Sequence, residues 1–189
     1  MNPVSNPAPR APLPGIHHIE LSLREVAQLF NTMDPSPFHE KDLDHDAEEF
    51  IVSWAQEFHR DEPVDLVLHL ENFPEGRDVA RDVQEAVHHY FDYRARLNRM
   101  EFTRLMKQGR ISLLVGVGFL VACFGVIEVF ALKGPGAFQK FAAEGLTIAG
   151  WVAMWKPMEI YLYDWWPLRR RGQIFEKLSR MPVELRGRV

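Results

Sequence analysis

The sequence predicts an α+β fold, in which a small cytoplasmic domain with two short strands and helices is followed by a long helix that leads into a two-helix transmembrane hairpin. The first observation is an apolar run, because residues 111–127 contain no charged side chain and the run stays apolar to Leu132 apart from Glu128. An apolar stretch of about 18 or more residues is long enough to cross a bilayer. A second apolar segment at 145–166 and a pair of short strand patterns in the first half of the chain complete the prediction.

Four segments follow one another along the 189 residues. They are a proline-rich disordered lead, a cytoplasmic α+β domain with a stalk helix, a transmembrane hairpin with spans near 111–132 and 145–166, and a cytoplasmic tail with a short helix. Their predicted bounds are 1–15, 16–110, 111–166 and 167–189.

Alternating apolar and polar residues predict strands at 16–23 and 65–71, since period two is the pattern of a half-buried strand. The segment 25–33 is typical of a short helix. Asp46 is predicted to cap the next helix, with Glu49 three residues later completing a capping box.

A long helix is predicted from Asp78, and only Gly109 offers a hinge before the first span. Its apolar residues recur at alternating spacings of four and three, which is a heptad-like pattern. They are Val79, Val83, Ala86, Tyr90, Tyr93, Leu97 and Met100. This stripe either covers the sheet of its own chain or mediates self-association. Because two strands alone are marginal in water, we expect a homo-oligomer, most simply a dimer.

Charge is distributed unevenly. Residues 1–110 hold 12 Lys and Arg against 20 Asp and Glu, a net charge of −8, whereas residues 111–189 hold 10 against 6, a net charge of +4. The acidity of the first part argues against a nucleic-acid partner. Basic and aromatic side chains flank the apolar segments, and by the positive-inside rule the basic side chains place both termini in the cytoplasm. The predicted membrane-interface residues are Arg104, Lys107, Arg110, Trp165, Trp166, Arg169, Arg170 and Arg171.

The apolar segments contain four acidic or basic side chains, namely Lys156, Glu159, Asp164 and Glu128. Counting from the start of the second segment at residue 145 places Lys156 near mid-membrane, with Glu159 three residues later on nearly the same face. Ionised groups at that depth are costly and are often functional. The pair either neutralises itself or lines a polar interface or an ion path.

Catalytic and metal-binding motifs are scarce. The single cysteine excludes an internal disulfide and a Cys-rich zinc module. The densest cluster of metal-ligand types is His39, Asp42, Asp44 and His45, but it precedes a helix, where acidic residues have a structural reason to lie. A capping loop is therefore favoured over a metal site, no cofactor is expected, and an enzyme is the less favoured class.

Two stretches together carry a resemblance to a known family. One is the run 34–44, DPSPFHEKDLD, and the other is GWVAMWKPME at 150–159 continuing to YDWWP at 163–167. The pairing resembles an uncharacterised family of bacterial two-span membrane proteins with a cytoplasmic α+β domain and a Trp-rich WKPxE…YDWWP motif. The resemblance implies the bacterial inner membrane as the location and transfers no catalytic residue.

These observations favour a membrane-anchored interaction or scaffold module whose acidic domain presents a surface to a cytoplasmic protein. The alternative is a subunit of an oligomeric transporter or of an ion or proton pathway that uses Lys156 and Glu159.

Overall fold

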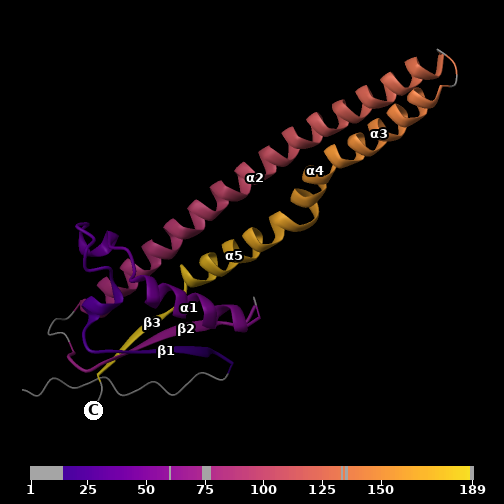
Figure 1. Cartoon of the computed structure of the whole chain (residues 1–189). Helices are drawn as coiled ribbons and strands as arrows, with labels where there is room; N and C mark the ends of the chain where they lie inside the picture. Colours follow the sequence, from indigo (N-terminus) through magenta and orange to yellow (C-terminus); the bar gives the residue numbers. More distant parts are fainter. Residues whose placement is uncertain (1–14, 60, 74–77, 133, 135, 188–189) are drawn as a thin grey trace, which may run out of the picture. The chain divides into compact units, whose positions relative to one another are not determined.

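The structure, a computed structural model, describes residues 15–59, 61–73, 78–132, 134 and 136–187. The predicted disordered lead lies outside the described residues except for Gly15. In chain order the elements are β1 (His17–Leu23), η1 (Val26–Leu29), η2 (Phe38–Glu40), α1 (His45–Glu57), β2 (Val64–Leu70), α2 (Val79–Leu132), α3 (Ala137–Ala153), α4 (Trp155–Glu159), η3 (Ile160–Asp164), α5 (Trp165–Leu178) and β3 (Val183–Gly187). The fold is α+β (Figure 1).

The chain forms two compact units. Unit 1 comprises residues up to 95 together with those from 173 onward, and unit 2 comprises residues 96–172. Unit 1 therefore combines the sequence before unit 2 with the sequence after it. Two helices, α2 and α5, have one end in each unit.

Unit 1 is built on a three-stranded parallel sheet in the order β1-β2-β3. The predicted strands near 16–23 and 65–71 are confirmed as β1 and β2. The third strand is a correction, because the sequence predicts two strands and a tail with only a short helix at 167–189, yet that stretch contains most of α5 and all of β3. β3 is five residues long, so its alternation is too brief to identify without its pairing to β2.

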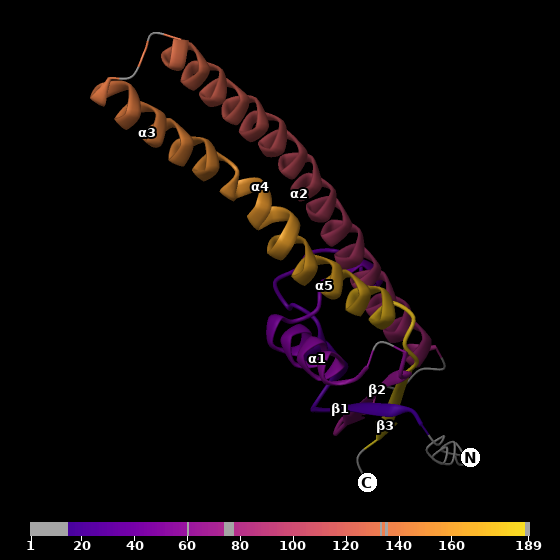
Figure 2. The same ribbon diagram turned by 90° about the vertical axis from the view of Figure 1, so that its right-hand side faces the viewer.

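One face of the sheet forms the core of unit 1. Ile19, Leu66 and Leu68 are fully buried there, and α1, α2 and α5 lie on that side of the sheet (Figures 1 and 2). The helices contribute the buried residues Ile51, Ala55, Val83, Val87, Phe91, Phe175 and Leu178. A three-stranded sheet whose apolar face is covered by helices meets the condition that an isolated pair of strands does not.

The long helix is confirmed as α2, which runs unbroken for 54 residues, about 80 Å. The first half of the heptad-like stripe covers the sheet of its own chain, because Val83 and Ala86 are buried in the core. Tyr93 and Met100, farther along, are 45% and 50% exposed. Gly109 is not a hinge. It lies inside the continuous helix, where Ile160 and Tyr161 of η3 approach it closely.

Two local predictions are wrong. Asp44, not Asp46, caps α1, and its carboxylate accepts a hydrogen bond from the backbone N–H of Asp46 (3.0 Å). A side chain at this position satisfies one of the free N–H groups of the first turn. The helix predicted at 25–33 is limited to the four-residue 3₁₀ turn η1.

Unit 2 is an antiparallel helical hairpin. A methyl group added at Gly116 of α2 would lie 3.0 Å from the carbonyl oxygen of Ala153, and one added at Gly150 of α3 would lie 3.7 Å from Cβ of Cys123. Farther down, the side-chain amide of Asn98 donates to the carbonyl of Leu168 (2.8 Å). The contacts thus keep one register over most of the hairpin.

By length and composition, α2 is the one described helix that is long and apolar enough to cross a membrane, and only 11% of its apolar stretch is buried. The returning chain is divided into α3, α4, the π-helical turn η3 and α5. It also exposes large apolar side chains, among them Phe141 and Trp155 at 76% and 72%. A soluble protein rarely exposes so much contiguous apolar surface.

Candidate functional site

Three charged residues of the returning chain form a cluster. The ammonium group of Lys156 donates a hydrogen bond to Glu159 Oε2 (2.9 Å) and lies 3.8 Å from Asp164 Oδ2. These side chains are 54%, 43% and 35% exposed, respectively. We call Lys156, Glu159 and Asp164 the charged triplet. The sequence-predicted pair is therefore joined by a second carboxylate.

A break in the helix positions the triplet. Pro157 has no backbone N–H, so the carbonyl of Ala153 receives no helical hydrogen bond from it. The regular helix stops at Met154, whose N–H bonds to Trp151 three residues back. A π-helical turn follows at Ile160–Asp164, and such turns widen a helix locally and often mark functional sites. The result brings Asp164 to the same side as Lys156.

The register of the hairpin sets the level of the triplet. Gly116 faces Ala153 and Met154, and Gly109 faces Ile160 and Tyr161. Lys156 therefore lies level with the first turn of the apolar run that starts at residue 111, next to the basic residues of α2. Counting from residue 145 alone places Lys156 near mid-membrane. The hairpin register does not support that position, because it aligns Lys156 with the start of the apolar run of α2.

A hollow opens beside Lys156. Its volume is about 380 Å³, and it is lined by Ser112, Val115, Gly116, Phe119, Ala153, Lys156 and Pro157. Ser112 and Lys156 supply its polar side chains, and the lining is otherwise apolar. We call this the hairpin hollow.

The predicted interface residues lie along both helices of unit 2. Arg104, Lys107 and Arg110 are exposed on α2, just before its apolar run. On α5 the indole N–H of Trp165 donates to the carbonyl of Tyr161 (2.8 Å), and the Arg169 guanidinium lies over the Trp165 ring, 5.8 Å from its centre. Trp166, Arg170 and Arg171 are exposed on α5, and Glu128 is exposed near the far end of α2.

The residues considered as metal ligands have local structural partners. Asp44 caps α1, and the backbone N–H of Asp42 donates to the Asp34 carboxylate (2.7 Å). This hydrogen bond, with another from Ser36, lowers the pKa of Asp34. His45 is exposed at the start of α1, and the side chain of His39 lies outside the described part. Within the described residues, no three His, Cys, Asp or Glu side chains are grouped as a metal site.

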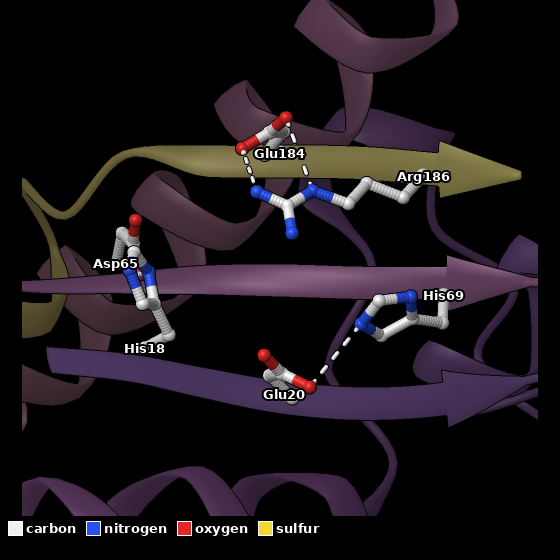
Figure 3. Close-up of polar contacts among 6 residues, drawn as sticks. All are labelled: His18, Glu20, Asp65, His69, Glu184 and Arg186. Atoms are coloured by element: carbon white, nitrogen blue, oxygen red, sulfur yellow. Dashed lines mark hydrogen bonds and ion pairs between the residues drawn. The ribbon is translucent and has the colours of Figure 1, made fainter. Parts of the chain in front are cut away.

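The second face of the sheet carries ionisable side chains, as Figure 3 shows. The ring of His18 donates from Nδ1 to Asp65 Oδ1 (2.6 Å), and His69 Nε2 lies 3.4 Å from Glu20 Oε2. On β3 the guanidinium of Arg186 donates two hydrogen bonds to the carboxylate of Glu184. We call these six residues the polar sheet face. The alternation in β1 and β2 predicts a polar face, but its β3 members could not be placed without the third strand.

A buried ionic network joins three helices of unit 1. Glu48 on α1, 8% exposed, accepts hydrogen bonds from the hydroxyl of Tyr90 (2.7 Å) and from Nε of Arg94 (2.8 Å), both on α2. The Arg94 guanidinium also lies over the ring of Phe175 on α5, 5.5 Å from its centre. Burial and the hydrogen bond to Glu48 raise the pKa of Tyr90 above its ordinary value of about 10. Sequence patterns do not pair residues this far apart.

We expect the cost of Tyr90→Phe to depend on pH. At pH 8 the variant leaves one oxygen of Glu48 without its donor, and we expect a loss of about 1–3 kcal/mol in the free energy of unfolding. Above pH 10 the unfolded wild type loses the tyrosine proton that the folded protein keeps, so wild-type stability falls by about 1.4 kcal/mol per pH unit and the gap closes.

Denaturant unfolding between pH 8 and pH 11 measures this gap, with Trp54 as the fluorophore and the other tryptophans replaced by Phe. Tyr93→Phe, at an exposed site on the same helix, is the control and should show no such gap. A Tyr90→Phe gap that stays constant with pH would contradict the buried hydrogen bond.

No family model, curated protein or solved structure matches the chain. The resemblance to bacterial two-span membrane proteins therefore stays a prediction.

Proposed function

We propose that the protein is an interaction module anchored in the bacterial inner membrane by its helical hairpin, with both termini in the cytoplasm. Unit 1 presents the polar sheet face to a cytoplasmic protein that carries a basic segment. The resemblance to two-span membrane proteins agrees with this location. Self-association stays a prediction: within one chain the sheet, the first half of the stripe and the charged triplet have partners, whereas Tyr93 and Met100 of the stripe are exposed.

The observation that carries the proposal is the second face of the parallel sheet, which no helix of the described residues covers. Parallel sheets are usually covered on both faces. In the described part of the chain, α1, α2 and α5 cover only the apolar face (Figures 1 and 2). On the other face Val67 is fully buried between Glu20 and Glu184 of the neighbouring strands. The charged side chains therefore form an ordered layer over the sheet.

Charge indicates the kind of partner. The polar sheet face has three carboxylates against one guanidinium, with two histidines. The residues of unit 1, namely 1–95 and 173–189, hold 11 Lys and Arg against 21 Asp and Glu, a net charge of −10, whereas residues 96–172 hold 11 against 5, a net charge of +6. Such a field attracts a basic segment and repels nucleic acid.

Anchoring is supported by the apolar run of α2 and by the apolar side chains exposed on α3 and α4. The basic residues precede the run on α2 and follow the returning chain on α5, which favours a cytoplasmic side for both. The transporter alternative gains no support from the hairpin register, because Lys156 lies level with the start of the apolar run and not with its middle.

Site-specific photo-cross-linking in cells tests the proposal. A photoreactive residue at Ser22, exposed on β1 beside His69, should give a discrete adduct with a protein that has a basic segment. The same residue at Ser53, exposed on α1, is the matched control and should give none.

Charge reversal separates docking from chance contact. Glu20→Lys on the polar sheet face should reduce the Ser22 adduct, whereas Glu57→Lys at an exposed site on α1 should leave it unchanged. In membranes prepared at about 0.5 M salt the adduct should weaken, because exposed charges are screened. Equal adducts from Ser22 and Ser53, or no adduct from a chain found in the membrane fraction, would contradict the proposal.

A further inference from the structure

The hairpin hollow has a polar end and an apolar end. Ser112 and Lys156 lie level with the start of the apolar run, whereas Val115 and Phe119 lie one and two turns farther along α2. The lining of the hollow therefore changes from polar to apolar along the helix axis. In a bilayer the same order runs from the headgroups to the acyl chains, so the hollow has the polarity profile of a lipid molecule.

The charged triplet selects among headgroups. The Lys156 ammonium lies 2.9 Å from the Glu159 carboxylate and 3.8 Å from the Asp164 carboxylate, and all three side chains are partly exposed. A headgroup with only a phosphate would meet two carboxylates as well as Lys156. A headgroup with both a phosphate and a primary ammonium complements the triplet, since the phosphate pairs with Lys156 and the ammonium donates hydrogen bonds to Glu159 and Asp164.

The hollow is open at a level where lipid is its neighbour, if the hairpin spans the membrane. Its volume of about 380 Å³ is near the lower end of ligand sites, which suits one segment of an acyl chain and not a whole lipid. The close approach of the two helices bounds the hollow, because Gly116 allows the α2 backbone to come near the carbonyl of Ala153.

We infer that the hairpin hollow and the charged triplet form a binding site for one aminophospholipid of the cytoplasmic leaflet, with its phosphate at Lys156 and Ser112, its ammonium at Glu159 and Asp164, and part of an acyl chain against Val115 and Phe119. This inference rests on the membrane anchoring proposed above. It assigns the triplet to lipid recognition.

Native mass spectrometry of the detergent-solubilised full chain tests the site. The probe is an equimolar mixture of phosphatidylethanolamine, phosphatidylglycerol and phosphatidylcholine with identical oleoyl chains. We expect one phosphatidylethanolamine per chain, bound about tenfold more tightly than the other two, because phosphatidylcholine has no N–H donor and phosphatidylglycerol has no ammonium.

Three variants assign the site to the residues. Lys156→Met removes the ammonium, and Ser112→Phe fills the hollow. Each should abolish the preference. Lys140→Met, at an exposed lysine in the first turn of α3, should retain it. Flotation with phosphatidylethanolamine-free liposomes measures anchoring separately, and all of these variants should float.

Each other result overturns the inference. Equal retention of the three lipids would show a nonspecific lipid shell. A preference for phosphatidylglycerol would show a simple anion site. A dimer without lipid that is lost in Lys156→Met would show that a second copy covers the hollow. A wild-type chain that does not float would instead refute the proposed anchoring, which distinguishes the two failures.

Discussion

Glu48→Ala is expected to lower the free energy of unfolding of unit 1 by about 3 kcal/mol. The substitution removes the acceptor shared by Tyr90 and Arg94, and it leaves a guanidinium and a hydroxyl without their partner inside the unit. Breaking a buried ion pair by removing one member is costly for this reason. Arg94 keeps 30% of its side chain exposed, so water relieves part of the cost.

Glu49→Ala is the matched control for this prediction. The two glutamates are neighbours on α1, but Glu49 is exposed, so its removal should change stability by no more than about 0.5 kcal/mol. Denaturant unfolding monitored by Trp54 fluorescence compares the two variants. Equal losses for both would show that Glu48 acts only through the charge of the helix.

Gly116→Leu is expected to separate the two helices of unit 2, whereas Gly118→Leu is expected to leave them together. A side chain at Gly116 meets the Ala153 carbonyl oxygen at 3.0 Å and the Met154 sulfur at 3.1 Å, and the first of these is backbone that cannot rotate away. A Cβ at Gly118 meets nothing within 4 Å. The same substitution two residues apart therefore isolates the helix contact from the change in composition.

Disulfide trapping measures this separation. A Cβ at Gly150 lies 3.7 Å from Cβ of Cys123, the single cysteine of the chain, and this spacing fits a disulfide. Gly150→Cys should cross-link to Cys123 on oxidation once Leu120 adopts another rotamer, and Gly145→Cys should not. Adding Gly116→Leu should reduce the cross-link strongly, and adding Gly118→Leu should not. Equal reduction by both would contradict the antiparallel register.

Patterns within a few residues predicted much of the fold. Alternation identified β1 and β2, and unbroken helical spacing identified α2, because each pattern repeats several times within its element. The charged pair at Lys156 and Glu159 was also predictable, since three residues separate its members on one helix.

Features that depend on distant residues were not predictable. β3 has only five residues and is defined by its pairing to β2. Glu48 lies at helical spacing with Ile51 and Ala55 on the buried face of α1, yet nothing nearby in the sequence indicates Arg94 as its partner. The level of Lys156 depended on how two helices align, and counting along one helix could not supply that alignment.

The sheet of unit 1 can be completed only late in the synthesis of the protein. Leu66 on the central strand pairs with Val183, which is synthesised 117 residues later, after the whole hairpin. At about 5–20 residues per second, β2 waits several seconds with one edge unpaired. Unpaired strand edges invite aggregation, so slow synthesis or folding of the intervening hairpin prolongs the exposure. Completion of the sheet is thus a late step of biogenesis that follows synthesis of both helices of the hairpin.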